Sequence, residues 1–138
     1  MTDTLLSAYV DYWQTLTPQS VPQLRTLVTP DFHFRDPFHD IIGLPAAEAM
    51  LQRMFQRLDA VRSEMLDCAH GQHAVYLRWR FTATHRGKPL VLDGMTELLR
   101  TEQGLIRAHL DHWDASRQVY EGVPVLGAAI RLCRRFAS

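Results

Sequence analysis

The chain has 138 residues, enough for one domain that buries a sizeable apolar core. Its 15 basic and 15 acidic residues cancel, and a formal net charge of zero argues against the broad basic surface that binds nucleic acid. Cys68 and Cys133 lie far apart and match no metal-binding spacing, which is typical of a reduced, cytoplasmic protein. The first residues lack the basic and apolar runs of a signal peptide, and no apolar stretch approaches the roughly 20 residues of a membrane span.

Helical patterns dominate the first half of the chain. Residues 3–16 place leucines and aromatic residues at helical spacing, so they predict an amphipathic helix that ends at Thr17-Pro18. Pro22 fits the first turn of a short second helix running to about Val28. A third helix is predicted over residues 45–58. Between these helices, residues 31–36 read as a strand that stops at Asp36-Pro37, because proline lacks a backbone donor.

Strand patterns dominate the second half. Residues 61–69, 73–85, 89–100 and 105–114 are separated by short turns, and the second of these segments alternates apolar and polar side chains. This order predicts an antiparallel meander after the helices, hence an α+β fold with helices gathered on one face of a curved sheet. A last helix is expected over about 123–136, with an apolar stripe and three arginines near its end.

Asp36 is the first candidate for chemistry. It follows a strand in the segment Phe34-Arg35-Asp36-Pro37-Phe38, at the edge of the predicted sheet and among aromatic residues. A carboxylate in apolar surroundings is a candidate proton carrier. The alternative is an aspartate that merely caps a turn after the strand. The sequence leaves both interpretations open.

His109 and Asp111 form the second candidate. Strand alternation puts them on one face with Trp113, and also with Leu105 and Arg107. They read either as a positioned acid/base pair or as two structural polar residues that satisfy each other. His109 and His112 point to opposite faces of the strand and therefore predict no metal site.

The predicted cone would have a pocket at its wide end, lined by polar and aromatic side chains from several elements. The third candidate polar residue, Thr96, lies on the preceding strand on the same face as Gly94 and Leu98. The expected lining comprises Tyr12, Trp13, Asp36, Phe38, Trp79, Thr96, His109, Asp111 and Trp113.

The segment Phe34-Arg35-Asp36-Pro37, the later Gly43 and the closing strand from Ile106 to Trp113 resemble the nuclear transport factor 2-like superfamily, in particular its SnoaL-like and ketosteroid isomerase-like members. The resemblance covers residues 5–114. It implies a cone-shaped antiparallel sheet wrapped around N-terminal helices in a single domain, with an extra C-terminal helix.

The ketosteroid isomerase-like pattern also implies roles for individual residues. It places Tyr12 where the family has an oxyanion-stabilising tyrosine, and Asp36 where it has the general base. Thr96 stands at the position of the family's second, protonated aspartate, and Trp113 matches its closing-strand tryptophan.

As function, this resemblance implies a small apolar ligand and cofactor-free proton transfer on a carbonyl or enone compound, by an isomerase or cyclase. The proton would move through Asp36, with Tyr12 and His109 or Thr96 steadying the oxyanion and Asp111 orienting His109. The alternative is a non-catalytic ligand-binding or dimerisation module. Homodimerisation through the outward sheet face and a weak contact of the C-terminal helix with an anionic membrane surface are further expectations. The face offered to a second subunit comprises Tyr76, Arg78, Arg80, Val91, Met95 and Leu99.

Overall fold

The computed structural model describes residues 3–119 and 123–137. The elements follow in the order α1 (Thr4–Gln14), η1 (Val21–Thr26, a 3₁₀ helix), β1 (Val28–Arg35), β2 (Asp40–Ile42), α2 (Leu44–Arg57), β3 (Asp59–His70), β4 (Val75–His85), β5 (Lys88–Arg100), β6 (Ile106–His112), α3 (Ala115–Gln118) and α4 (Pro124–Ala137). This arrangement confirms the predicted α+β class.

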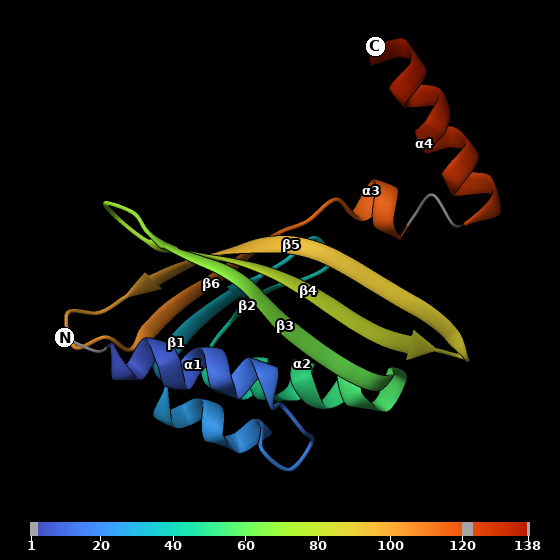
Figure 1. The fold of residues 1–138 in the computed structure, drawn as a ribbon. Helices are drawn as coiled ribbons and strands as arrows, with labels where there is room; N and C mark the ends of the chain where they lie inside the picture. The colour runs from blue at the N-terminus through green and yellow to red at the C-terminus, as the bar shows by residue number, and fades with distance from the viewer. Residues whose placement is uncertain (1–2, 120–122, 138) are drawn as a thin grey trace.

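The strands form one curved sheet in the order β2-β1-β6-β5-β4-β3. Neighbouring strands are antiparallel except β1 and β6, which run parallel. Four consecutive strands, β3 to β6, form the antiparallel meander that the sequence predicts. Because β6 pairs with both β5 and β1, the early β1–β2 hairpin is joined to the late meander along this one strand (Figure 1).

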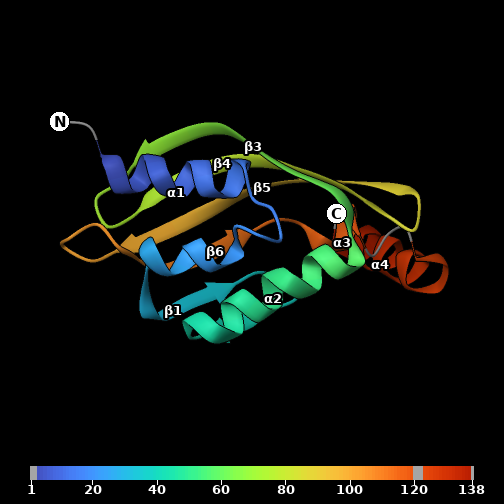
Figure 2. The same cartoon turned by 90° about the horizontal axis from the view of Figure 1, so that it is seen from below.

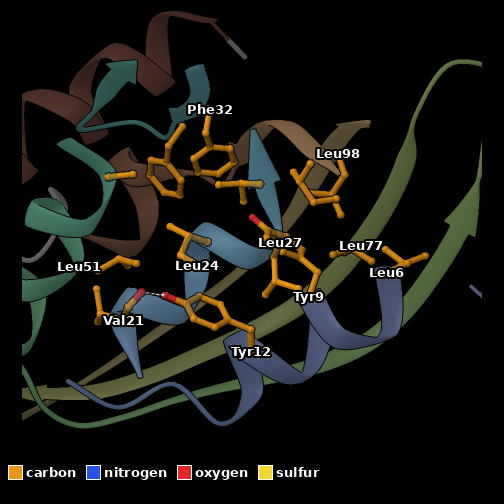
Figure 3. Packing of buried hydrophobic residues seen from close by; sticks show 14 of the residues in the cluster. Leu6, Tyr9, Tyr12, Val21, Leu24, Leu27, Phe32, Leu51, Leu77 and Leu98 are labelled. Carbon is orange, nitrogen blue, oxygen red and sulfur yellow. Dashed lines mark hydrogen bonds between the residues drawn. The ribbon is translucent and has the colours of Figure 1, made fainter. Parts of the chain in front are cut away.

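Helices α1, η1 and α2 all lie on one face of the sheet, which curves over them (Figures 1 and 2). The apolar side chains of these helices pack against the inward side chains of the strands, because burying that surface is the main driving force for folding. Tyr9, Leu24, Leu51, Leu77 and Leu98 are among the most buried members of this core, and Figure 3 labels all five.

Several boundaries differ from those predicted. The second helix is a short 3₁₀ segment, and β1 begins at Val28 instead of residue 31. Strand β2 was not predicted, because three residues are too few to show an alternation; it pairs with β1 through His33↔Ile42 and Arg35↔Asp40.

The sequence predicts the wrong face of the sheet for one side chain of the closing strand, that of Arg107. Arg107 is exposed, whereas its neighbour Ile106 is buried. The β5–β6 pairing shifts register between Leu99 and Arg100, which inserts an extra residue and reverses the alternation before Ala108. His109 and Asp111 lie beyond this irregularity and keep the side predicted for them.

The C-terminal helix α4 extends away from the sheet and its helices (Figure 1). In the described part of the chain, no helix combines the length and apolarity needed to cross a membrane.

Candidate functional site

A chain of side-chain hydrogen bonds runs through the interior from α1 to β4. The Tyr9 hydroxyl lies 2.7 Å from Nδ1 of His109, and Nε2 of His109 lies 2.8 Å from Oδ1 of Asp111. The Thr96 hydroxyl donates to the same Oδ1, and the Trp79 indole N–H donates to Thr96 at 2.7 Å. Five side chains from four elements therefore form one connected polar network.

The chemistry of the groups fixes the direction of these bonds when Asp111 is ionised. A carboxylate only accepts, so both Thr96 and Nε2 of His109 donate to it. A neutral His109 then has no hydrogen on Nδ1, and the Tyr9 hydroxyl donates to that nitrogen. The imidazole is thus held in one tautomer from both sides.

Aromatic rings enclose the His109 imidazole. It is only 5% exposed and stacks on Phe34 at a centroid distance of 5.0 Å, with Trp13 at the same distance. The Phe34 contact follows from the parallel pairing of β1 with β6, which sets Phe34 directly beside His109. The hydroxyl of Tyr9 shares this environment, and burial raises the pKa of Tyr9 well above its ordinary value.

Gly94 allows Trp79 to reach Thr96. Trp79 and Gly94 are directly opposite on β4 and β5, and a Cβ at residue 94 would lie 2.6 Å from the Trp79 ring and 3.0 Å from Cβ of Trp113. Only a residue without a side chain leaves room for the indole to lie over the strand. This close approach holds the donor against Thr96, which is itself 1% exposed.

The buried network reaches an open groove at Asp111. The groove has a volume of about 670 Å³ and is lined by Arg35, Asp36, Pro37, Asp111, His112, Trp113 and Asp114. Both hydrogen bonds to Asp111 use Oδ1. Among the described residues, no hydrogen bond is made to Oδ2, so this oxygen remains available to a ligand in the groove.

Asp36 lines the same groove but also closes a turn. Its Oδ1 accepts the backbone N–H groups of Phe38 and His39 at 2.8 and 2.7 Å, and Nδ1 of His39 lies 2.9 Å away. The turn between β1 and β2 therefore depends on this carboxylate, as the turn-cap interpretation expects. The two interpretations of Asp36 do not exclude each other, since its second oxygen makes no hydrogen bond within the described residues.

The remaining predicted residues are spread around the site. The Tyr12 hydroxyl donates to the carbonyl of Val21 at 3.0 Å (Figure 3). Burial raises the pKa of Tyr12 above its ordinary value. Trp13 lies beside the imidazole, with its indole nitrogen buried and unpartnered among the described residues. Phe38 is exposed and touches Trp113 edge-to-face at 5.3 Å.

Sequence reasoning missed Tyr9, which was assigned only to the apolar face of the first helix. Tyr9, and not Tyr12, hydrogen-bonds His109. The two tyrosines are one helical turn apart, so spacing alone gave no reason to choose between them. The one available signal was that the helix offers two hydroxyls on a face that must pack against a strand containing a histidine.

In the part of the chain that the structure describes, no group of three or more histidine, cysteine or acidic side chains is placed to hold a metal ion. The His109–Asp111 pair is instead satisfied by Tyr9 and Thr96.

Comparisons with known proteins agree with the fold described above. The family described as SnoaL-like domain matches residues 8–109. No significant match was found among curated proteins. A hypothetical protein from Catenulispora acidiphila with a ketosteroid isomerase-like fold, solved in complex with trimethylamine, is 17% identical at a TM-score of 0.70, covering 86% of this chain and 92% of its own.

Two further solved structures have the same fold. An LEH-like epoxide hydrolase of Mycobacterium tuberculosis is 14% identical, with a TM-score of 0.69 and coverage of 94% of this chain and 93% of its own. A putative SnoaL-like polyketide cyclase from Jannaschia sp. CCS1 is 13% identical, with a TM-score of 0.66 and coverage of 80% and 85%. These likenesses show the fold.

Proposed function

Because this chain belongs to the SnoaL-like domain family, we propose that it binds a small apolar carbonyl or enone compound in the groove and moves a proton on it without a cofactor. The observation that carries the proposal is the position of Asp111, which joins the buried network through Oδ1 and faces the groove. Structures of this fold include a putative polyketide cyclase and an LEH-like epoxide hydrolase.

In this proposal Asp111 is the proton carrier. A general base must be held rigidly within reach of the proton it removes. Thr96 and His109 fix one carboxylate oxygen, and the other takes the proton from an acidic C–H group of the bound compound. Arg35, which lines the same groove, places a positive charge where the carbonyl oxygen becomes negative.

Asp36 supplies the second carboxylate of the groove. Its position after β1 is the one that the ketosteroid isomerase-like resemblance assigns to a base, and it lies in the same groove as Asp111. Asp111 returns the proton that it removed to a second carbon of the bound compound and is then ionised again, while Asp36 orients the compound from across the groove. Trp113 and Phe38 provide the apolar wall for the ligand.

The test uses a β,γ-unsaturated cyclic ketone and a cyclic 1,3-diketone as probes. Isomerisation of the ketone is followed by the absorbance of the conjugated product, and exchange of the diketone C–H with D₂O by proton NMR. We expect Asp111→Asn to lower both rates at least a hundredfold, because the amide keeps the shape but does not take the proton. Asp36→Asn tests whether the second carboxylate of the groove contributes to the rate, and Asp31→Asn, an exposed change on β1, is the matched control.

A second candidate function is a non-catalytic binding or dimerisation module. Aromatic rings fill the space around His109, and the outward sheet face exposes Tyr76, Val91 and Met95. Such a face suits pairing with a second copy of the chain. Light scattering after size exclusion should give twice 15.9 kDa if the sheet pairs, and Met95→Asp should then return the monomer.

A further inference from the structure

Trp79 is connected to the carboxylate of the groove but does not line the groove itself. The side chains that surround the groove include Asp111, and Trp79 is not among them. The Trp79 indole N–H donates to the Thr96 hydroxyl at 2.7 Å, and that hydroxyl donates to Oδ1 of Asp111. Trp79 therefore reaches the carboxylate through one intermediate side chain.

The register of the sheet builds this connection. Thr96 on β5 is directly opposite Asp111 on β6, whereas Trp79 on β4 is opposite Gly94, two residues before Thr96. A long side chain can reach such a diagonal neighbour on the adjacent strand. Gly94 leaves the indole room to do so, since a Cβ at this position would lie 2.6 Å from the ring.

The donor at the Trp79 end fixes the direction of both hydrogen bonds. An indole N–H only donates, so the Thr96 oxygen accepts from it, and the single hydroxyl hydrogen of Thr96 is used for Asp111. Thr96 is 1% exposed, and within the described residues its hydroxyl makes these two hydrogen bonds and no other. A hydroxyl that accepts a hydrogen bond becomes a stronger donor, because neighbouring bonds in a chain polarise one another. Trp79 thus strengthens the hold of Thr96 on Oδ1.

We propose that Trp79 is a positioning residue for proton transfer, which acts through Thr96 to fix Oδ1 of Asp111 and so keeps Oδ2 directed at the compound in the groove. This inference rests on the function proposed above. In the step itself, a C–H bond of the compound breaks, an O–H bond forms at Oδ2, and the electron pair moves onto the carbonyl oxygen. Trp79 touches neither the compound nor the reacting atoms.

Kinetics with the two ketone probes tests this role. We expect Trp79→Phe to lower kcat about tenfold and to leave KM within about twofold, because it disturbs the reacting oxygen and no contact with the ligand. Thr96→Val removes the hydroxyl and should lower kcat by at least as much, whereas Thr96→Ser keeps the hydroxyl and should retain the rate. In a Thr96→Val background, Trp79→Phe should have no further effect on kcat, because its connection to the carboxylate is already lost.

Nuclear magnetic resonance reads the same connection without any activity. The three tryptophans give three indole N–H signals, and sequential assignment identifies the one that belongs to Trp79. We expect this signal to move in Asp111→Asn, because residue 111 is the next member of the hydrogen-bonded chain after Thr96. Asp36→Asn removes a charge from the same groove and is the matched control, in which the signal should stay in place.

An unchanged kcat in Trp79→Phe overturns the proposal, and so does an indole signal that responds equally to the two carboxylate variants. Circular dichroism shows whether each variant folds. If Trp79→Phe does not fold, Thr96→Val and Thr96→Ser decide, and equal rates of these two variants overturn the proposal. If the unchanged chain moves no proton on either probe, the proposed function fails, and the indole signal alone then shows whether Trp79 is coupled to Asp111.

Discussion

The Tyr9 hydroxyl and Nδ1 of His109 are 2.7 Å apart in the core, although 100 residues separate them in the chain. This bond ties the first helix to the last strand at the point where the polar network begins. Because Nε2 of the same ring bonds Asp111, the tyrosine also influences how the carboxylate at the groove is held.

Tyr9→Phe should destabilise the fold by about 1–3 kcal/mol. The ring remains, but Nδ1 of His109 loses its partner inside the core, and an unsatisfied buried polar group has a free-energy penalty of this size. Urea unfolding followed by circular dichroism measures it. Tyr76→Phe removes a hydroxyl from the exposed sheet face and should change the unfolding free energy by less than about 0.5 kcal/mol. Equal effects of the two changes would contradict a special role for the Tyr9 bond.

Stability should fall steeply in alkali. Burial raises the pKa of Tyr9 and Tyr12 above their ordinary value of 10.0, so the unfolded chain releases these protons at a lower pH than the folded chain. Their contribution is therefore complete below pH 10 and is lost as the pH rises above it, by about 1.4 kcal/mol per pH unit for each tyrosine. Urea midpoints between pH 8 and 11 measure the slope. Tyr12→Phe should make it shallower, and an unchanged slope would contradict the assignment.

Gly94→Ala should disturb the site without touching a polar group. The new methyl would lie 2.6 Å from the Trp79 ring, so the indole must move and release its hydrogen bond to Thr96. We expect a loss of about 1–3 kcal/mol, as for other overpacked cores, together with a change in tryptophan fluorescence. In a Trp79→Leu background the clash with the indole is removed and only the 3.0 Å approach to Cβ of Trp113 remains, so the additional loss caused by the alanine should be smaller. If Gly94→Ala cost as much stability in the Trp79→Leu background as in the unchanged chain, the clash would not be with the Trp79 ring.

Two substitutions of Asp36 separate the stability that its hydrogen bonds give to the turn from the effect of its negative charge. Asp36→Ala removes the acceptor of two backbone N–H groups and should lower stability by about 1 kcal/mol. Asp36→Asn keeps an oxygen in the same place and should lose much less. Chemical unfolding of the two variants makes the comparison, and equal losses would mean that the negative charge, not the hydrogen bonds, holds the turn.

Much of this site follows from strand alternation. The predicted faces of β5 and β6 bring Thr96 and Asp111 to the same side, and the structure sets them directly opposite each other. Alternation could not reveal the register shift that turns Arg107 outward, because a bulge has no fixed pattern in a single sequence.

Tertiary packing decided the rest. Tyr9 and Tyr12 belong to one helical face, and only the angle at which α1 crosses the sheet selects Tyr9 for His109. Asp36 both closes a turn and lines the groove. This depends on how the chain turns after Pro37, where His39 folds back to contact the carboxylate. The Asp36-Pro37 step predicts the end of the strand. The groove beside it could not be predicted locally, because its other wall is formed by the distant closing strand and the residues after it.

The place of β6 between β1 and β5 affects how the chain must fold. Until residues 106–112 have been synthesised, β1 lacks its parallel neighbour and β5 has one open edge. Contacts between segments so far apart in the chain form slowly, because a long loop must close first. The hairpin of β1 and β2 and the meander of β3 to β5 are therefore two halves with exposed edges on the ribosome. They become one sheet only when the last strand enters, and the groove is completed in that same step.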